Sequence, residues 1–106
     1  HAAYELIVIA DVLIYFGALD AVFAAAAQAL APGGLMVFTV EIHAGGVQSP
    51  PFVIKPSGRY GHAPRYVEQA LAAQGLELLS SHAVVLREEF TQPVAGLVVS
   101  ARRGAA

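Results

Sequence analysis

Hydrophobic residues in the first part of the chain follow the patterns of a strand, a helix and a second strand. Residues 4–10, YELIVIA, are apolar and largely β-branched, which is typical of a strand buried on both faces of a parallel sheet. Residues 35–41, LMVFTVE, have the same character. Between these runs, apolar residues recur every three or four positions and predict one face of a helix over residues 19–30: Leu19, Val22, Phe23, Ala26, Ala27 and Leu30.

The predicted helix has signals at both ends. Asp20 lies in its first turn, where a negative charge interacts favourably with the helix dipole. Pro32-Gly33-Gly34 follows its last turn and supplies a helix breaker and glycines that tolerate positive φ. Strands joined by a helix of about three turns form a crossover in which both strands are parallel. We therefore predict a right-handed βαβ unit over residues 4–41.

Residues 42–62 show no sustained period and are rich in glycine and proline. Loops of this length without secondary structure are uncommon in compact domains and are usually functional. We therefore expect this segment to be a mobile lid over the edge of the sheet.

The last part of the chain predicts a helix and two strands. The helix runs from Pro64, which suits the first helical position, to Gln74, and Gly75 ends it. Residues 77–86 and 94–101 predict strands that a short charged segment joins into an antiparallel hairpin. The predicted order is β-α-β-loop-α-β-β, an α/β fold, and the inner face of the second helix is Val67, Ala70 and Leu71.

Composition narrows the class of protein. The 106 residues allow one domain, and a chain that is 57% apolar and 13% charged is expected to fold. A net charge of −2 with six scattered basic residues argues against a nucleic-acid partner. The chain has no cysteine and its four histidines lie far apart, so we expect no metal site. Charged residues interrupt the apolar runs before they reach membrane-spanning length, and we expect a soluble, cytoplasmic protein.

The segment YELIVIADVLIYFGALDAVFAAAAQALAPGGLMVFTVE resembles the fourth strand, following helix and fifth strand of class I S-adenosylmethionine-dependent methyltransferases. The closing hairpin resembles the pair in which the family's seventh strand lies antiparallel between the fifth and sixth. The segment PSGRYGHAPRYVEQALAAQGLELL looks like the stretch leading into the family's last helix. Similarity is greatest to bacterial methyltransferases fused to tetratricopeptide repeats, although this chain contains no repeat. The resemblance covers about residues 3–102.

The resemblance implies methyl transfer from S-adenosylmethionine to a small-molecule acceptor in a complete protein. The family's glycine-rich turn after the first strand has no counterpart in residues 1–106, so we expect this chain to be the acceptor-side, carboxyl-terminal half of a methyltransferase domain. We expect it to bind the cofactor weakly or not at all by itself. The first strand would then lack a neighbour, and we expect a homodimer formed through it.

Two groups of residues are candidates for a site. The resemblance places Ala10, Asp11, Val12 and Tyr15 at the cofactor, because ligands of open α/β sheets bind beyond the carboxyl ends of strands. A purely structural role for Asp11, closing the turn by bonding to nearby amides, remains open.

The second group belongs to the predicted lid. His43, His62 or Glu41 could act as a base if the acceptor must lose a proton, and Arg59, Tyr60 and His62 could bind the acceptor. The competing interpretation is that each of them is a solvated loop residue.

Two other functions remain open. The chain could be a binding or assembly module without catalysis, or half of a nicotinamide-dependent reductase. Strand order separates the reductase from the methyltransferase, because the antiparallel last strand is absent from the usual reductase topology.

Overall fold

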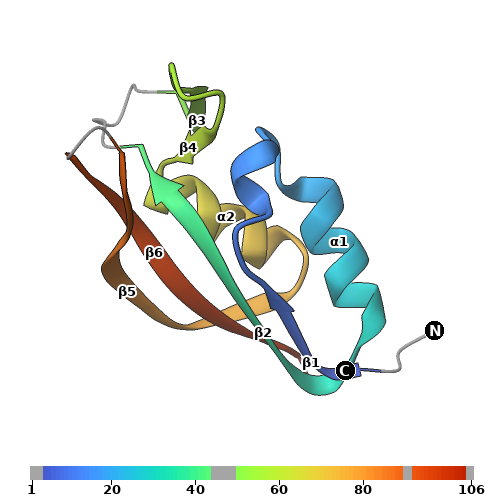
Figure 1. Ribbon diagram of the computed structural model, residues 1–106. Coiled ribbons are helices and arrows are strands. Elements are labelled where there is room, and N and C mark those ends of the chain that lie inside the picture. The colour runs from blue at the N-terminus through green and yellow to red at the C-terminus, as the bar shows by residue number, and fades with distance from the viewer. Residues whose placement is uncertain (1–3, 44–49, 90–91, 105–106) are drawn as a thin grey trace.

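A computed structural model describes residues 4–43, 50–89 and 92–104. These residues form a mixed six-stranded sheet and two α-helices (Figure 1). The main path of the sheet is β3-β4-β2-β6-β5, and β1 pairs with β2. The elements are β1 (Tyr4–Ile9), the 3-10 helix η1 (Leu13–Tyr15), α1 (Asp20–Ala29), β2 (Leu30–Ile42), β3 (Phe52–Ile54), β4 (Tyr60–His62), α2 (Pro64–Ala73), β5 (Leu76–Glu89) and β6 (Gln92–Arg103).

The predicted βαβ unit is confirmed. Strand β1 pairs in parallel with β2, with Leu6 opposite Leu35 and Ile9 opposite Phe38. Helix α1 is one residue shorter at each end than predicted, and strand β2 begins at Leu30, ahead of the expected position. Because β2 starts immediately after α1, the Pro32-Gly33-Gly34 segment lies within this strand, and Gly33 has a φ of 77°.

The last strand enters the middle of the sheet. Strand β6 is antiparallel to β2 on one side and to β5 on the other. The pairs Phe38 with Val99 and Leu78 with Ala101 set the two registers. Strands β1, β2 and β5 are consequently parallel to one another, and β6 runs antiparallel between β2 and β5, as the resemblance implied.

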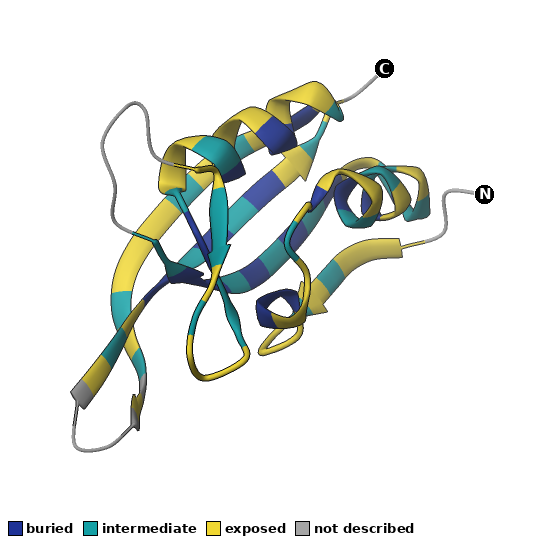
Figure 2. Cartoon of the chain, turned by 90° about the horizontal axis from the view of Figure 1, so that it is seen from above, coloured by how far each residue is buried: buried dark blue, intermediate teal, exposed yellow. Residues whose placement is uncertain are grey.

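Both helices cover the same face of the sheet, and the core lies between them and the strands (Figure 2). The sheet contributes alternate residues, which is the period of two expected for a strand with one buried face. Helix α2 begins at Pro64, and Gly75 follows it at a φ of 73°, as its sequence predicted. The central side chains are Phe23, Ala26, Met36, Phe38, Val40, Val67, Ala70, Leu71, Leu97, Val99 and Ala101.

The prediction that β1 is buried on both faces is wrong. Ile7 and Ile9 pack against the core, whereas Leu6 and Val8 point to the opposite side and are more than half exposed. No helix among the described residues covers that second face, and β1 pairs only with β2 there. The apolar side chains on this face are therefore open to solvent.

The prediction of an irregular loop over residues 42–62 is also wrong in part. Strands β3 and β4 form a short antiparallel hairpin, with Phe52 opposite His62 and Ile54 opposite Tyr60. Three-residue strands are too short to show a hydrophobic period, and for that reason the sequence did not predict them. Residues 44–49 lie outside the described part of the chain, and the predicted mobility of the segment stays a prediction.

Candidate functional site

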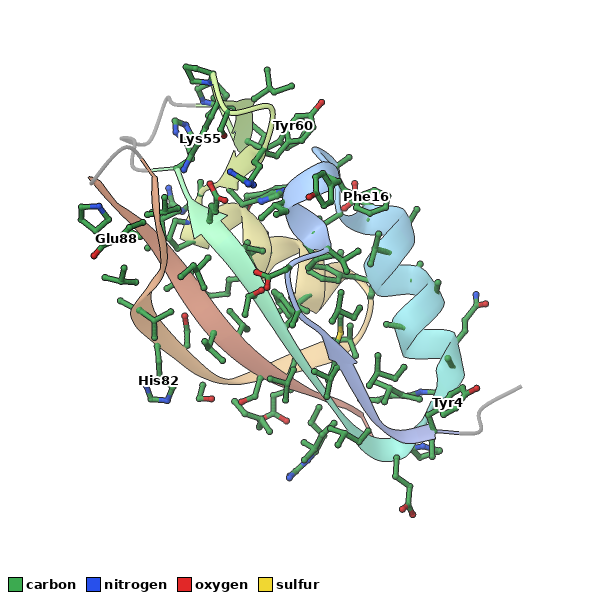
Figure 3. The ribbon with its side chains drawn as sticks, viewed as in Figure 1. Tyr4, Phe16, Lys55, Tyr60, His82 and Glu88 are labelled. Atoms are coloured by element: carbon green, nitrogen blue, oxygen red, sulfur yellow. The ribbon has the colours of Figure 1, made fainter. Side chains whose placement is uncertain are left out.

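The carboxyl ends of the parallel strands meet the β3–β4 hairpin at one end of the molecule. Strand β1 pairs with β2 as far as Phe38, and β4 pairs with the same edge of β2 from Glu41 onward. Strands β1 and β4 therefore lie one after the other along the same edge of β2, and the chain leaves the sheet between them, at the end of β1. Figure 3 shows Phe16, Lys55 and Tyr60 at this end and Tyr4 at the opposite one.

Asp11 forms a sharp turn directly after β1. Its φ of 57° makes it the only non-glycine residue of the described chain in the left-handed region, which aspartate tolerates better than most residues. Its backbone N–H donates to Oγ1 of Thr39, 3.1 Å away on β2. The turn is thus tied to the neighbouring strand, while the Asp11 side chain remains exposed.

The residues after Asp11 divide into a buried and an exposed set. Leu13 and Ile14 of η1 enter the interior, whereas Val12 and Tyr15 are 45% and 64% exposed. The exposed set, together with Ala10 and Asp11, is the group that the sequence predicted at the cofactor. The structure brings these four residues together on one turn at the predicted edge of the sheet.

Four rings connect the hairpin with helix α2. Phe52 lies 6.0 Å from Tyr60, 6.2 Å from His62 and 5.7 Å from Tyr66, measured between ring centroids. His62 and Tyr66 are stacked, with an interplanar angle of 12°. These contacts anchor the hairpin on the helix side of the sheet.

His62 joins the hairpin to the segment after η1. Its Nε2 lies 2.9 Å from the carbonyl oxygen of Phe16 and 3.0 Å from that of Gly17. Its side chain has no exposed surface, and burial lowers the pKa of His62 below its ordinary value, an effect that the two carbonyls and the nearby Glu41 charge oppose. The interpretation of His62 as a solvated loop residue is therefore wrong.

Gly17 is the point of closest contact between this segment and the hairpin. A Cβ atom at Gly17 would lie 2.6 Å from Cε1 of Phe52 and 3.1 Å from Cε1 of Tyr60. Only glycine allows the two rings to lie this close to the backbone. The packing of the hairpin on the turn therefore depends on a residue without a side chain.

Glu41 is buried and paired. Its Oε1 lies 3.1 Å from Nζ of Lys55, and the Glu41 side chain is 2% exposed. The solvated-loop interpretation is wrong for Glu41 too, because a charge at this depth is stable only with a partner.

The remaining candidates differ in their surroundings. His43 is half-buried, its backbone N–H donates to the carbonyl of His62, and its Nε2 has no hydrogen-bond partner among the described residues. Arg59 and Tyr60 are half-buried at the start of β4, and the backbone of Lys55 donates to the Arg59 carbonyl. In the described ranges no three His, Cys, Asp or Glu side chains gather into a metal site, and no helix there is long and apolar enough to cross a membrane.

Several residues of this region were missed at the sequence level. Lys55, Phe52 and Gly17 carry the ion pair and the close packing, yet each lies far along the chain from its partner. The hydroxyl of Tyr66 on α2 also accepts a hydrogen bond from the N–H of Leu19 at 2.8 Å. No local pattern predicts such contacts.

Solved structures share this fold. A structure described as SAM-dependent methyltransferases from Methanosarcina mazei matches 99% of the chain and 61% of its own, with a TM-score of 0.77 at 11% identity. The N-methyltransferase NodS from Bradyrhizobium japonicum, in complex with S-adenosyl-L-homocysteine, matches 96% and 47%, with a TM-score of 0.67 at 20% identity. The [4+2]-cyclase SpnF matches 98% and 52%, with a TM-score of 0.75 at 14% identity.

No protein-family model and no curated protein matches the sequence. The matches to solved structures show that the chain has the fold of class I S-adenosylmethionine-dependent methyltransferases, as the resemblance implied. It spans between 47% and 61% of the length of these solved structures.

Proposed function

We propose that the protein containing this chain transfers a methyl group from S-adenosylmethionine to a small molecule, with residues 1–106 forming the acceptor-side half of the domain. The observation that carries this proposal is the position of β6, antiparallel between β2 and β5. On the other edge of β2, the turn after β1 and the β3–β4 hairpin lie next to each other. Fold alone does not define chemistry, and the cyclase on the same fold illustrates this. The proposal therefore also needs a suitable site.

The turn after β1 suits one wall of a cofactor site. Val12 and Tyr15 offer exposed apolar surface to an adenosine moiety, and Asp11 offers a carboxylate to a hydroxyl or an ammonium group. Bound S-adenosylmethionine supplies an electrophilic methyl group on a sulfonium. Alignment of the acceptor with that methyl group in a site that excludes water is the main task of the protein.

Among the three candidate bases, we propose His43. His62 has no exposed side-chain surface, and Glu41 is buried in its ion pair with Lys55. His43 is only half-buried, although its Nε2 atom is itself buried, without a hydrogen-bond partner among the described residues. We further propose that Arg59 and Tyr60, at the hairpin, bind the acceptor.

The nicotinamide-reductase alternative is disfavoured by strand order, because its usual terminal topology lacks an antiparallel strand between β2 and β5. A non-catalytic binding module is consistent with the same fold. Ligand binding at the turn after β1 separates a cofactor site from such a module.

The test is a titration of the 15N-labelled chain with S-adenosyl-L-homocysteine, observed through backbone amide shifts. We expect weak, millimolar-range binding with shifts concentrated at Ala10, Asp11, Val12 and Tyr15. Tyr15→Ala should weaken these shifts, whereas His82→Ala, which changes an exposed residue on β5, should not. Shifts that concentrate away from this turn, or that NADH reproduces equally, would contradict the proposal.

We also propose a homodimer formed through β1. Its outer edge pairs with no described strand, and Tyr4, Leu6 and Val8 expose apolar surface beside that edge. An unpaired strand with exposed apolar residues is a template for pairing with a second copy.

A further inference from the structure

His62 on the β3–β4 hairpin bonds to the backbone of Phe16 and Gly17, which follow the turn after β1 and η1. We propose that His62 is a positioning residue whose Nε2–H group holds the Phe16 and Gly17 carbonyls, so that the acceptor-side hairpin and the cofactor-side turn move as one unit. The terms cofactor-side and acceptor-side rest on the proposed function. The mechanical coupling of the two segments does not.

The two partners of Nε2 determine which tautomer His62 adopts. Backbone carbonyl oxygens only accept hydrogen bonds, and Nε2 lies within 3.0 Å of two of them. Nε2 must therefore carry the proton, and in the neutral ring Nδ1 is the unprotonated nitrogen. Nδ1 is buried and has no hydrogen-bond partner among the described residues, so no neighbour there favours the other tautomer.

Tyr66 adds a second attachment to the same segment. Its hydroxyl accepts the N–H of Leu19, the residue that caps the start of α1 and whose amide has no partner inside the helix. Because the Tyr66 and His62 rings are stacked, the two attachments reinforce each other. Together they satisfy backbone groups of Phe16, Gly17 and Leu19 that neither η1 nor α1 satisfies by itself.

Close packing makes this attachment specific to one arrangement. Phe52 and Tyr60 lie against Gly17 with no room for a Cβ atom. The hairpin cannot slide along the segment without a collision between its rings and the backbone. It can only separate from it, and separation breaks both His62 hydrogen bonds.

The consequence is a coupling between two parts of the site. Val12 and Tyr15 belong to the turn and short helix that end at Phe16. When the hairpin separates, the carbonyls of Phe16 and Gly17 lose their donor, and η1 loses the support at its carboxyl end. Acceptor access and the order of the cofactor wall are therefore linked through His62.

Amide hydrogen exchange in the 106-residue chain tests the coupling. His62→Gln keeps a donor near the position of Nε2, whereas His62→Leu fills similar space without a donor. We expect His62→Leu to accelerate exchange at the Tyr15 and Phe16 amides, which bond to Val12 and Leu13, by about tenfold. His62→Gln should remain within about threefold of the wild type.

Three controls accompany these variants. His82→Leu removes an exposed histidine from β5 and should leave exchange unchanged. The amides of the β1–β2 ladder should remain protected in every variant. Tyr66→Phe removes only the acceptor of the Leu19 amide and should accelerate exchange there with a smaller effect at Phe16.

Two results would overturn the proposal. The first is equal exchange in His62→Leu and His62→Gln, since His62 would then only fill space. The second, which needs no variant and covers the case in which His62→Leu fails to fold, is a wild-type ring protonated at Nδ1, read from long-range 1H–15N correlations of the imidazole. Neither depends on ligand binding, so a titration with S-adenosyl-L-homocysteine that contradicts the proposed function would leave this test intact.

Discussion

The ammonium nitrogen of Lys55 lies 3.1 Å from Oε1 of Glu41, and the lysine stem reaches this position by passing over Gly61. The pair joins the end of β2 to the turn between β3 and β4, on residues that are 14 positions apart. Glu41 is buried, whereas Lys55 is partly exposed. The carboxylate therefore depends on a partner that remains accessible to water.

Removal of Lys55 should destabilise the chain. Lys55→Met leaves a buried carboxylate without its cation, and we expect the free energy of unfolding to fall by about 2 kcal/mol, less than for a fully buried pair because Lys55 is partly solvated. Urea denaturation measures the change. Adding Glu41→Gln should recover at least half of the loss, and Arg65→Met, which removes an exposed cation, should change stability by less than about 0.5 kcal/mol. An additive double mutant would argue against the pair.

A side chain at Gly61 should displace the same lysine. The new Cβ of Gly61→Ala would lie 2.7 Å from Cε of Lys55, so the ammonium must leave Glu41. We expect a loss of about 1–2 kcal/mol in urea denaturation. In a Lys55→Ala background the clash is absent, and Gly61→Ala should then cost much less. Equal costs in both backgrounds would mean that Gly61 matters for another reason.

The backbone conformation of Asp11 predicts that a glycine variant is more stable than an alanine variant at this position. Because its φ is positive, Asp11→Ala should lower the free energy of unfolding by about 1 kcal/mol, whereas Asp11→Gly should stay close to the wild type. Thermal and urea unfolding report both values. If alanine were as stable as glycine, conformation would not be the reason for aspartate at this position.

The buried His62 predicts a dependence of stability on pH. Its folded pKa lies below the ordinary 6.5, so as pH falls below about 6.5 the unfolded chain binds a proton that the folded chain does not. Stability should therefore decrease from pH 6.5 down to the lowered pKa and become independent of His62 below it. Urea unfolding across this range should show a smaller decrease for His62→Gln than for the wild type. A His82→Gln variant should retain the wild-type decrease, and a His62→Gln profile that parallels the wild type would contradict this assignment.

Self-association should depend on β1. Val8 and Val85 are 62% and 63% exposed on β1 and β5, so they form a matched pair. We expect sedimentation equilibrium to give a dimer for the wild type and for Val85→Lys, and a monomer for Val8→Lys, whose charge lies beside the unpaired edge. A wild-type monomer at micromolar concentration would remove the dimer, and dissociation by Val85→Lys would move the contact to β5.

Sequence periodicity predicted the elements that are long enough to show it. The inner faces of both helices agree with the structure because a repeated local pattern sets them, and the β5–β6 hairpin agrees because its connection is short. The place of β6 beside β2 was implied by the family resemblance and not by periodicity. The β3–β4 hairpin was missed because its strands have three residues each. The exposed face of β1 was also missed, since composition reports which side chains avoid water and not whether an element is present to cover them.

The sequence predicted the location of the candidate site more accurately than the roles of its residues. The turn at Asp11 lies where strand order put it, whereas Glu41 and His62 are buried on partners from distant segments. Single-sequence patterns carry no information on such partners. The cofactor, acceptor and base assignments, and the greater similarity to repeat-fused methyltransferases, stay predictions.

The position of β6 has a consequence for how the chain is made. Strand β5 pairs only with β6 among the described strands, and β6 also completes the outer side of β2. Residues 92–103 leave the ribosome after β2 and β5, so these two strands lack their β6 partner until synthesis has passed residue 103. Such non-local pairing slows folding and leaves apolar edges open to aggregation in the meantime. Nascent chains that stop before residue 92 should therefore be substrates for chaperones or proteases, whatever ligand the mature protein binds.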